Sequence, residues 1–571
     1  MNQVILKVEN LTSVYNYGKI TLNNTNKLPT LSKGEISLHP CSFEIYKNSI
    51  VAILGPSGCG KSTLLKTLVG INQIASGKIH FNGYDLSKNY DYLKTYIGYV
   101  PQNDSDAIHF DLTLYQCLEL TARLRLSDLS ISEQDNRIKE VISKLQLGDI
   151  KNKIIKNLSG GQIKRVSIAS EMLIKPKILF LDEPTSPLDP QMVSDFLMTL
   201  KKIAKEGTTI LIVTHKPEDI DFMDECIFMG KGGFLCFKGK KNELFTYFNT
   251  INILDIFKIL NSKKIHEYAK KYYFNNPNNK NSYTNKNIIL DENRNINYIS
   301  QFKNLLYRSY LRKTNDYVSL LITLIQAPFI SLLLVLIFEK LDQFVLFFTS
   351  ISSIFFGINN ASKEIISEIN IFKRERMYNQ GIHPYIISKV VFLSLLGLIQ
   401  STFFITIIYY AYHYNNSHVI DYLGMIFWMT FSISISSILG LVLSAVSKNS
   451  ESVMSKIPIA LIPQIMLSGI ISKITTSKLV TFLSYFTISR WIITGFARIQ
   501  PTIELAEISG LKKTIKIISI QMGNTYDQYL KTKYNFPFFE FVILLIHGLF
   551  YYLIVYMSLK IKDSNHRKLT L

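Results

Sequence analysis

The sequence contains little cysteine, and all of it lies in the N-terminal half of the chain. Its five cysteines are Cys41, Cys59, Cys117, Cys226 and Cys236. The C-terminal half therefore cannot form a disulfide of its own, and the spacing of the five matches no metal site. We interpret them as reduced thiols in the cytosol.

Acidic residues are scarce relative to basic ones. The chain has 63 lysines and arginines against 43 aspartates and glutamates, a formal net charge of +20. Such an excess is typical of nucleic-acid binding, or of lysines and arginines at the cytoplasmic ends of membrane helices. The first residues also lack a basic segment followed by an apolar one, so we expect no cleavable signal peptide.

The apolar residues, 47% of the chain, are distributed unevenly. Residues 1–248 alternate short β-branched runs with helical stretches, which predicts an α/β domain. Residues 249–297 are expected to form an asparagine-rich linker, disordered from about residue 270. Residues 298–571 contain apolar runs long enough to cross a membrane, which excludes a purely soluble enzyme. The predicted fold is therefore an α/β domain followed by an all-α transmembrane domain.

Six membrane spans are predicted in the C-terminal half. A basic amphipathic helix at 298–316 should lie along the cytoplasmic membrane surface before the first of them. The spans are expected near 318–338, 341–359, 386–411, 419–446, 455–472 and 538–559. A long external loop, 473–537, precedes the last span. Its apolar part should dip into the bilayer rather than cross it, because Arg490 would lie inside a span.

The distribution of lysine and arginine predicts the orientation. With the N-terminus inside, the inner segments hold 13 of these residues, and the two short outer loops hold only Lys340. The positive-inside rule then places both termini in the cytoplasm. We expect the plasma membrane or a bacterial inner membrane rather than an internal one.

Four polar residues in the predicted spans, Gln326, Gln464, Glu540 and His547, are candidates for a translocation path. Such groups are costly in hydrocarbon. We expect Glu540 to be solvated near the outer interface. For His547, a place in the path and a hydrogen bond to another helix both remain open.

The clearest motif follows the apolar run 50–54 and opens a helical run. It consists of Gly55, Pro56, Ser57, Gly58, Cys59, Gly60, Lys61, Ser62 and Thr63. The glycines let backbone N–H groups converge on phosphate oxygens, and the helix N-terminus favours negative charge. Lys61 would contact the β- and γ-phosphates and Ser62 would ligate Mg²⁺. The motif predicts a P-loop nucleotide-binding domain.

A pair of carboxylates ends another buried strand. Asp182 and Glu183 follow the apolar residues 178–181. Asp182 is placed to bind Mg²⁺, and Glu183 to act as the general base that polarises the attacking water. With the phosphate loop, the pair predicts an active ATPase.

Between these motifs lie Leu158, Ser159, Gly160, Gly161 and Gln162, which resemble the signature of ATP-binding-cassette (ABC) proteins. In that family the signature of one subunit closes over the nucleotide held by the phosphate loop of the other. The resemblance implies ATP and Mg²⁺ as cofactors, with Ser62, Gln102 and Asp182 holding the metal. It also implies that Gln102 senses Mg²⁺ and the membrane domain, and that His215 contacts the γ-phosphate. Tyr15 is placed to stack on adenine, but an ordinary packing role is equally open.

The order of the domains, cassette first and six spans second, resembles the G-type (White) subfamily of half-transporters. The loop 364–389 looks like that subfamily's coupling segment. Two residues depart from the pattern of the family. Pro187 stands where the family has a small residue, so the contact across the dimer would change. Gln162 stands where eukaryotic relatives have glutamate.

The resemblance implies an ATP-driven exporter of a lipid or amphipathic small molecule, working as a dimer of two half-transporters, by default two copies of this chain. The alternative is a membrane-anchored ABC ATPase that acts mechanically or in signalling. Six spans argue against a nucleic-acid partner.

Overall fold

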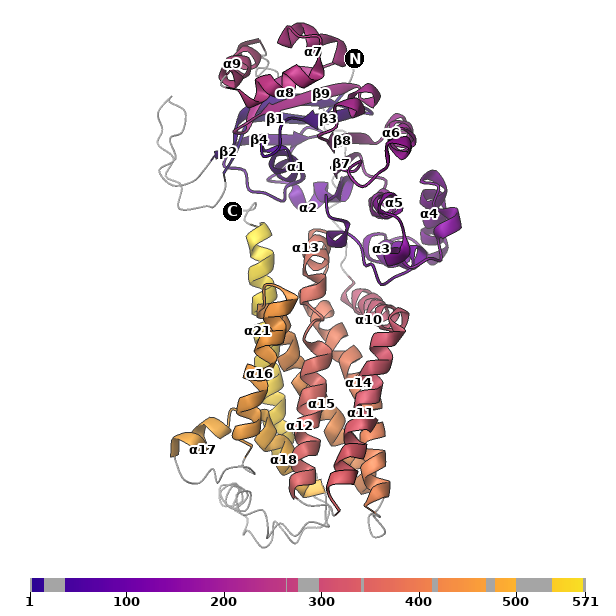
Figure 1. Ribbon diagram of the computed structural model, residues 1–571, viewed down its shortest axis with the longest axis vertical. Helices are drawn as coiled ribbons and strands as arrows, with labels where there is room; N and C mark the ends of the chain where they lie inside the picture. Colours follow the sequence, from indigo (N-terminus) through magenta and orange to yellow (C-terminus); the bar gives the residue numbers. More distant parts are fainter. Residues whose placement is uncertain are drawn as a thin grey trace. The chain divides into compact units, whose positions relative to one another are not determined.

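The computed structural model describes residues 3–14, 36–262, 264–275, 297–339, 343–412, 419–468, 478–499 and 537–567, which form two compact units (Figure 1). The first comprises Met1–Ile296, Asn370–Asn379 and Asp563–Leu571, and the second comprises Asn297–Ile369 and Gln380–Lys562. The short segment Asn370–Asn379 comes from the middle of the membrane half of the sequence. It nevertheless belongs to the same unit as the N-terminal domain.

The first unit is built on a sheet of six strands in the order β10-β9-β3-β8-β7-β6. The strands are β3 (Ile50–Leu54), β6 (Ile97–Val100), β7 (Ile178–Asp182), β8 (Thr209–Val213), β9 (Glu225–Gly230) and β10 (Phe234–Gly239). All are parallel to their neighbours except β10, which pairs antiparallel with β9. Every residue of β3, β7 and β8 is buried, as expected for continuous apolar runs in a parallel sheet. The loops that follow β3 and β7 leave the same edge of the sheet, on either side of β8.

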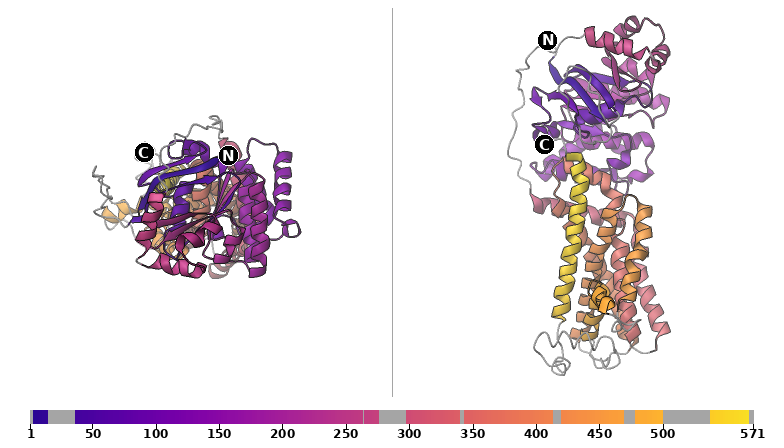
Figure 2. Two further views of the ribbon diagram at one scale, coloured as in Figure 1. Left: turned by 90° about the horizontal axis from the view of Figure 1, so that it is seen from above. Right: turned by 90° about the vertical axis from the view of Figure 1, so that its left-hand side faces the viewer.

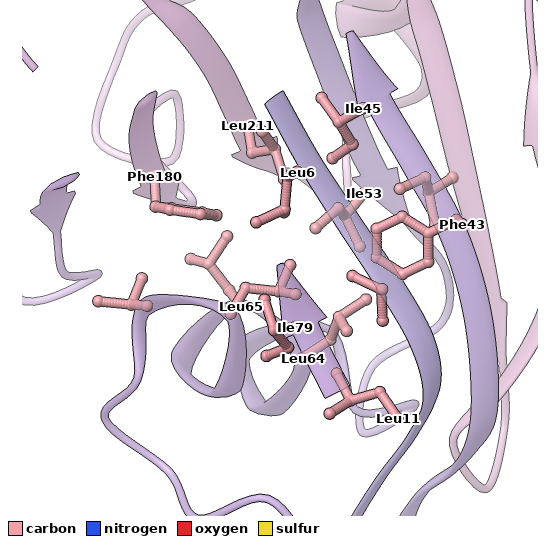
Figure 3. Packing of buried hydrophobic residues seen from close by; sticks show 14 of the residues in the cluster. Leu6, Leu11, Phe43, Ile45, Ile53, Leu64, Leu65, Ile79, Phe180 and Leu211 are labelled. Atoms are coloured by element: carbon pink, nitrogen blue, oxygen red, sulfur yellow. The ribbon is translucent and has the colours of Figure 1, made fainter. Parts of the chain in front are cut away.

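A second, antiparallel sheet has the order β2-β1-β4-β5. Its strands are β1 (Val4–Val14), β2 (Ile36–Tyr46), β4 (Ser76–Phe81) and β5 (Tyr84–Asp85). Leu6 of β1 and Ile53 of β3 belong to one buried apolar cluster with Leu64 and Leu65 of helix α1 (Lys61–Val69) (Figure 3). This packing fixes α1, and with it the loop before the helix, against both sheets.

The remaining helices of this unit fall into two groups. The group that includes the signature contains α3 (Leu114–Arg125), α4 (Ile131–Lys144) and α5 (Gly160–Met172), which contact one another. The others are α2 (Tyr90–Leu93), α6 (Pro190–Lys205), α7 (Lys241–Phe248), α8 (Ile253–Asn261), α9 (Ile265–Asn275) and α13 (Ile369–Met377), which forms most of the segment Asn370–Asn379.

The structure differs from the predicted linker at 249–297. Helices α8 and α9 lie inside that range, and α9 contacts β10. Ile256 and Leu260 are buried at helical spacing on α8, and the Tyr272 hydroxyl of α9 donates to the Ser42 carbonyl at 3.2 Å. The N-terminal domain therefore extends to Asn275. Residues 276–296 lie outside the described part of the chain.

The second unit is a bundle of helices (Figure 2). Its helices are α10 (Tyr298–Asn315), α11 (Tyr317–Ile337), α12 (Gln343–Ala361), α14 (Ile382–Ala411), α15 (Val419–Val446), α16 (Ser450–Met466), α17 (Lys478–Ser484), α18 (Ile488–Ile499) and α21 (Phe538–Arg567). The six predicted spans correspond to α11, α12, α14, α15, α16 and α21. Five of the six are long and apolar enough to cross a membrane, whereas α16 has only 17 residues.

Helices α17 and α18 meet at an angle of 77°, as in a broken span or a re-entrant loop. They occupy the stretch that the sequence predicts to dip into the bilayer. Every residue from Ile488 to Ala497 is buried, and the Arg490 guanidinium lies 4.4 Å from the Tyr485 ring. An arginine inside this apolar stretch is therefore held by protein contacts.

Helices α12 and α15 pack most closely in this bundle. A Cβ on Gly357 of α12 would lie 2.5 Å from the Ile433 carbonyl oxygen, and one on Gly440 of α15 would lie 2.8 Å from the Ile358 carbonyl oxygen. Only glycine fits at either position. Small residues at such contacts let membrane helices approach closely, because association there depends on packing.

The expectation that Glu540 is solvated is wrong. Its side chain is 0% exposed, and its Oε1 lies 2.9 Å from Nη2 of Arg498 at the end of α18. Burial by α18 was not evident from the spans alone. Nδ1 of His547 lies 2.9 Å from the Ile543 carbonyl of its own helix, rather than bonding to another helix, which was one of the two open alternatives.

The other two polar candidates also have partners. Gln464 accepts from the Ser489 N–H at 3.1 Å, which joins α16 to α18. Gln326 donates to the Thr323 carbonyl of its own helix at 2.9 Å. A place for His547 in a translocation path stays a prediction.

The arginines of α10 are paired inside the protein. Buried Glu368 receives the guanidinium groups of Arg308, at 3.4 Å, and of Arg312. It also accepts from Lys389 of α14 at 3.0 Å and from the Tyr385 hydroxyl at 3.3 Å. One carboxylate thus joins α10 to α14, and two of the charges that predicted a membrane-surface helix stabilise the bundle.

We predict that Glu368→Gln lowers the free energy of unfolding by about 3 kcal/mol, because it leaves buried cations without their carboxylate. Denaturant titration of the purified protein in detergent measures the effect. Glu451→Gln, which changes an exposed acid on α16, serves as the control. Equal stability of the two variants would contradict a structural role for this ion cluster.

Candidate nucleotide-binding site

The phosphate loop joins β3 to α1, as the sequence predicts. Gly55, Gly58 and Gly60 have φ angles of 151°, 74° and 94°. A Cβ on Gly55 would lie 2.1 Å from the Met229 carbonyl oxygen, and one on Gly60 would lie 2.9 Å from that of Ser37. Backbone from β9 and β2 therefore determines the path of the loop, and no side chain fits at Gly55 or Gly60.

Lys61 lies at the start of α1 with its ammonium group turned toward the loop. Its Nζ donates to the carbonyls of Gly55 at 2.8 Å and Pro56 at 2.9 Å. A phosphate oxygen accepts more strongly than a neutral carbonyl, because the bond is assisted by charge on both partners. The loop and its lysine therefore fit a bound phosphate group.

The predicted magnesium ligands are brought together at the neighbouring strand ends. The Ser62 hydroxyl donates to Oδ1 of Asp182 at 3.0 Å, and Nε2 of Gln102 donates to Oε2 of Glu183 at 3.1 Å. Hydroxyl, carboxylate and amide oxygens are the ligands that Mg²⁺ prefers. Burial raises the pKa of Asp182, and the Ser62 hydrogen bond opposes that rise. A divalent cation would favour the charged carboxylate further, so these residues fit the metal.

Glu183 has an unusual backbone conformation. Its φ angle is 48°, in the left-handed region, and its N–H donates to the Val213 carbonyl at 3.0 Å. A non-glycine residue with this φ angle has a strained backbone, which the surrounding structure must hold in place. His215 is 53% exposed and places Nδ1 3.6 Å from Oε2 of Glu183. The predicted general base thus contacts both Gln102 and His215.

Buried Asp219 was missed by the motif analysis. It accepts from the Thr214 hydroxyl at 2.6 Å and from the Thr185 hydroxyl at 2.9 Å. Thr214 precedes His215, and Thr185 lies two residues after Glu183. Asp219 therefore ties the two loops that carry these site residues. Its position four residues after His215 was the only sequence signal.

The signature begins α5 with a capping box. The Gln162 N–H donates to the Ser159 hydroxyl at 3.3 Å, and the Ser159 N–H donates to Oε1 of Gln162 at 3.1 Å. Glutamine and glutamate serve this motif equally well, because only a side-chain oxygen is needed. The departure at Gln162 therefore leaves the local structure of the signature intact.

Two further residues of α5 were also missed, and they hold the Gln102 loop and the segment Asn370–Asn379. Buried Lys164 donates to the Gln102 carbonyl at 3.0 Å and pairs with Asp104 at 3.0 Å. Near the other end of α5, fully buried Glu171 contacts Arg374 and accepts from the Tyr378 hydroxyl at 3.2 Å. Glu171 also pairs with Arg125 at 3.0 Å, so the carboxylate is shared by two guanidinium groups.

Two predicted binding residues need separate mention. Tyr15 lies outside the described residues. Cys59, inside the phosphate loop, is buried, and burial raises the pKa of its thiol. It is therefore a neutral packing residue at physiological pH. All five cysteines are buried and free of disulfides, in agreement with reduced thiols.

Comparison with known proteins assigns the family. A profile described as ABC transporter matches residues 38–186, and one described as ABC-2 type transporter matches residues 300–500. A Clostridium acetobutylicum protein named as an ABC transporter ATP-binding protein is 34% identical over 230 residues, 40% of this chain and 81% of that protein. The chain belongs to the ABC transporter family. It consists of an N-terminal cassette and a C-terminal ABC-2 membrane domain.

Other relatives of this ABC transporter match it over different lengths. An ABC transporter ATP-binding/permease protein of Mycobacterium tuberculosis is 27% identical over 499 residues, 84% of this chain and 57% of that protein. ABC transporter G family member 22 of Arabidopsis thaliana is 38% identical over 220 residues, 37% of this chain and 28% of that protein. The solved structure of cbiO1 from Clostridium perfringens, part of the ABC transporter complex cbiONQ, is 32% identical and covers 43% of this chain and 91% of its own, with a TM-score of 0.38. The chain thus spans little more than half the length of the first of these relatives and less of the second.

Pro187 of this ABC transporter lies against the signature within the same chain. A Cβ on Gly160 would lie 3.1 Å from Cβ of Pro187, and one on Gly161 would lie 2.4 Å from Cδ2 of Leu188. The loop that follows Glu183 therefore packs against both signature glycines, of which Gly160 is exposed and Gly161 is buried. An altered contact across a dimer stays a prediction.

We predict that Asp219→Ala lowers the free energy of unfolding by about 2–4 kcal/mol, because two buried hydroxyls lose their acceptor. ATP turnover should fall as well, since the loops that carry Glu183 and His215 are no longer joined. Thermal unfolding and a phosphate-release assay measure the two effects. Asp221→Ala is the control, because the Asp221 side chain is 63% exposed. Normal turnover in Asp219→Ala would show that this carboxylate does not organise the site.

Proposed function

We propose that this ABC transporter is an ATP-driven exporter of a lipid or amphipathic small molecule, working as a dimer of two copies. The observation that carries the proposal is the Arg374–Glu171 contact, which joins the segment Asn370–Asn379 to the helix that begins with the signature. An ATPase that drives movement in a membrane needs such a connection. The G family relatives support the half-transporter arrangement, and the class of cargo rests on the resemblance to the G-type subfamily alone.

The cassette residues supply the ATPase chemistry. Lys61 and the loop N–H groups bind the phosphates, and Ser62, Gln102 and Asp182 hold Mg²⁺. The bound metal neutralises charge on the phosphate oxygens. Glu183 accepts the proton of the attacking water.

Two further groups complete each site. His215 contacts the γ-phosphate. The signature of the second copy, beginning at its Ser159, closes the site from the other side, so neither copy hydrolyses ATP efficiently alone.

Helix α5 carries movement from the nucleotide to the membrane domain. Its first turn forms the signature, and Glu171 lies in its last turn. When the signature moves onto the nucleotide of the second copy, Glu171 moves with it and displaces Arg374. The segment 370–379 continues directly into α14, so its displacement reaches the membrane helices.

The first test is ATP hydrolysis by the purified protein reconstituted in lipid. We predict that Glu183→Gln lowers kcat by roughly 10²- to 10⁴-fold, because it removes the general base, and leaves ATP binding intact. Glu218→Gln, which changes an exposed acid three residues after His215, should hydrolyse ATP at the parental rate. Equal turnover in the parent and Glu183→Gln would disprove the assigned base.

Transport is measured in sealed vesicles with a panel of fluorescent lipids and amphipathic compounds. ATP-dependent movement of one panel member in the parent, absent in Glu183→Gln, would support the exporter. Hydrolysis with no movement across the whole panel would favour the membrane-anchored ATPase.

We predict that Arg374→Gln uncouples transport from hydrolysis. Glu171 keeps Arg125 as its partner in this variant, so the cassette should fold and its ATP turnover should stay within a fewfold of the parent. The amount of cargo moved per ATP hydrolysed should fall, because the contact between α5 and the segment is lost. Lys363→Gln, an exposed residue before the segment, is the control. An unchanged ratio in Arg374→Gln would refute this route of coupling.

A further inference from the structure

A cavity of about 700 Å³ lies inside the first unit, next to the nucleotide site. Ser62, Gln102 and Asp182 line one part of it, and Lys373 and Arg374 of the segment Asn370–Asn379 line another. The cavity therefore joins the residues that fit Mg²⁺ to the segment that we assign to coupling. Neither the phosphate loop glycines nor the signature borders it.

Two lysines in the cavity wall are available for an anion. Lys66 lies four residues after Ser62, on the same face of α1, and Lys373 belongs to the segment. Both are half-buried. Within the described residues, no carboxylate lies within 4.0 Å of either ammonium group, unlike Arg374, which is paired with Glu171.

The two acidic residues that line the cavity already accept hydrogen bonds from other residues. Asp106 accepts from Nδ2 of Asn370 at 2.8 Å, and Asp182 accepts from Ser62 at 3.0 Å. Burial raises the pKa of Asp182, and the charge of Lys66 opposes that rise. No carboxylate of the described residues lies within 4.0 Å of either lysine, however, so their partial burial carries a desolvation cost that an anion offsets. A small, doubly charged oxyanion suits two ammonium groups better than an organic acid, because each can donate to a separate oxygen.

We propose that this cavity binds inorganic phosphate, held by Lys66 and Lys373, after it leaves the nucleotide. The proposal rests on the ATPase function given above, which releases phosphate beside Ser62 and Asp182. The two lysines attract the departing anion, so their charge draws phosphate from the nucleotide toward the segment Asn370–Asn379. Phosphate would then contact the coupling segment through Lys373 while ADP stays on the phosphate loop.

Binding of inorganic phosphate tests this without turnover. The full-length protein in lipid nanodiscs is saturated with ADP and Mg²⁺ and titrated with phosphate, and binding is followed by ³¹P NMR. We expect saturable binding in the parent and an affinity about tenfold weaker in Lys66→Gln and in Lys373→Gln, since each removes one charge-assisted contact. Lys202→Gln, an exposed lysine on α6, should bind as the parent does. ADP affinity in each variant shows that the cassette is folded.

Several outcomes would overturn the proposal. Phosphate that does not saturate the parent, or that binds both lysine variants with parental affinity, rules out this site. An equal loss with Lys202→Gln would show a general effect of charge instead. If ATP is hydrolysed but the lysines do not affect phosphate binding, the cavity proposal fails alone. If phosphate binding depends on the lysines but the protein hydrolyses no ATP, the proposed function fails alone.

Discussion

The rigidity of helix α5 is the constraint on which the other contacts of the cassette depend. Its 13 residues span about 20 Å, and the backbone hydrogen bonds of a helix do not stretch appreciably. Ser159 caps one end, Lys164 holds the Gln102 loop from the middle, and Glu171 receives Arg374 near the other end. A displacement at the signature must therefore appear at all three places. Gln102 and the segment 370–379 therefore need no further connection to move when the signature moves.

Buried carboxylates are used in the same way on both sides of this segment. Glu171 joins two arginines within the first unit, and Glu368 joins α10 to α14 within the second. A buried ion cluster contributes little net stability, but removing one member is costly, so the geometry is held within narrow limits. Only Ile369 separates Glu368 from the segment in the sequence. Both clusters thus hold the chain firmly where it passes from one unit to the other.

The sequence allowed the nucleotide site to be predicted wherever function resides in a contiguous motif. The phosphate loop depends on local glycine conformations, and Asp182 and Glu183 follow a strand whose burial is evident from its composition. The roles of Asp219 and Glu171 were not predictable, because each joins a segment distant in sequence: Asp219 reaches Thr185, and Glu171 reaches Arg374. The error at Glu540 has the same origin: only the folded chain shows that α18 covers it. The linker was placed too early because the asparagine-rich run at 275–287 was extended back to residue 249, across the apolar spacing of α8.

The structure shows what several of the basic residues of the chain contact. Arginines on α10 and in the segment 370–379 pair with buried acids, so part of the basic excess serves packing rather than nucleic acid. Lys66 and Lys373 have no carboxylate within 4.0 Å among the described residues, and both line the cavity beside Ser62 and Asp182. Linkage is reciprocal. If the position of the segment changes the affinity for phosphate, phosphate bound to Lys373 would change the free energy of that position by the same amount. The departure of phosphate, rather than that of ADP, would then reset the membrane domain.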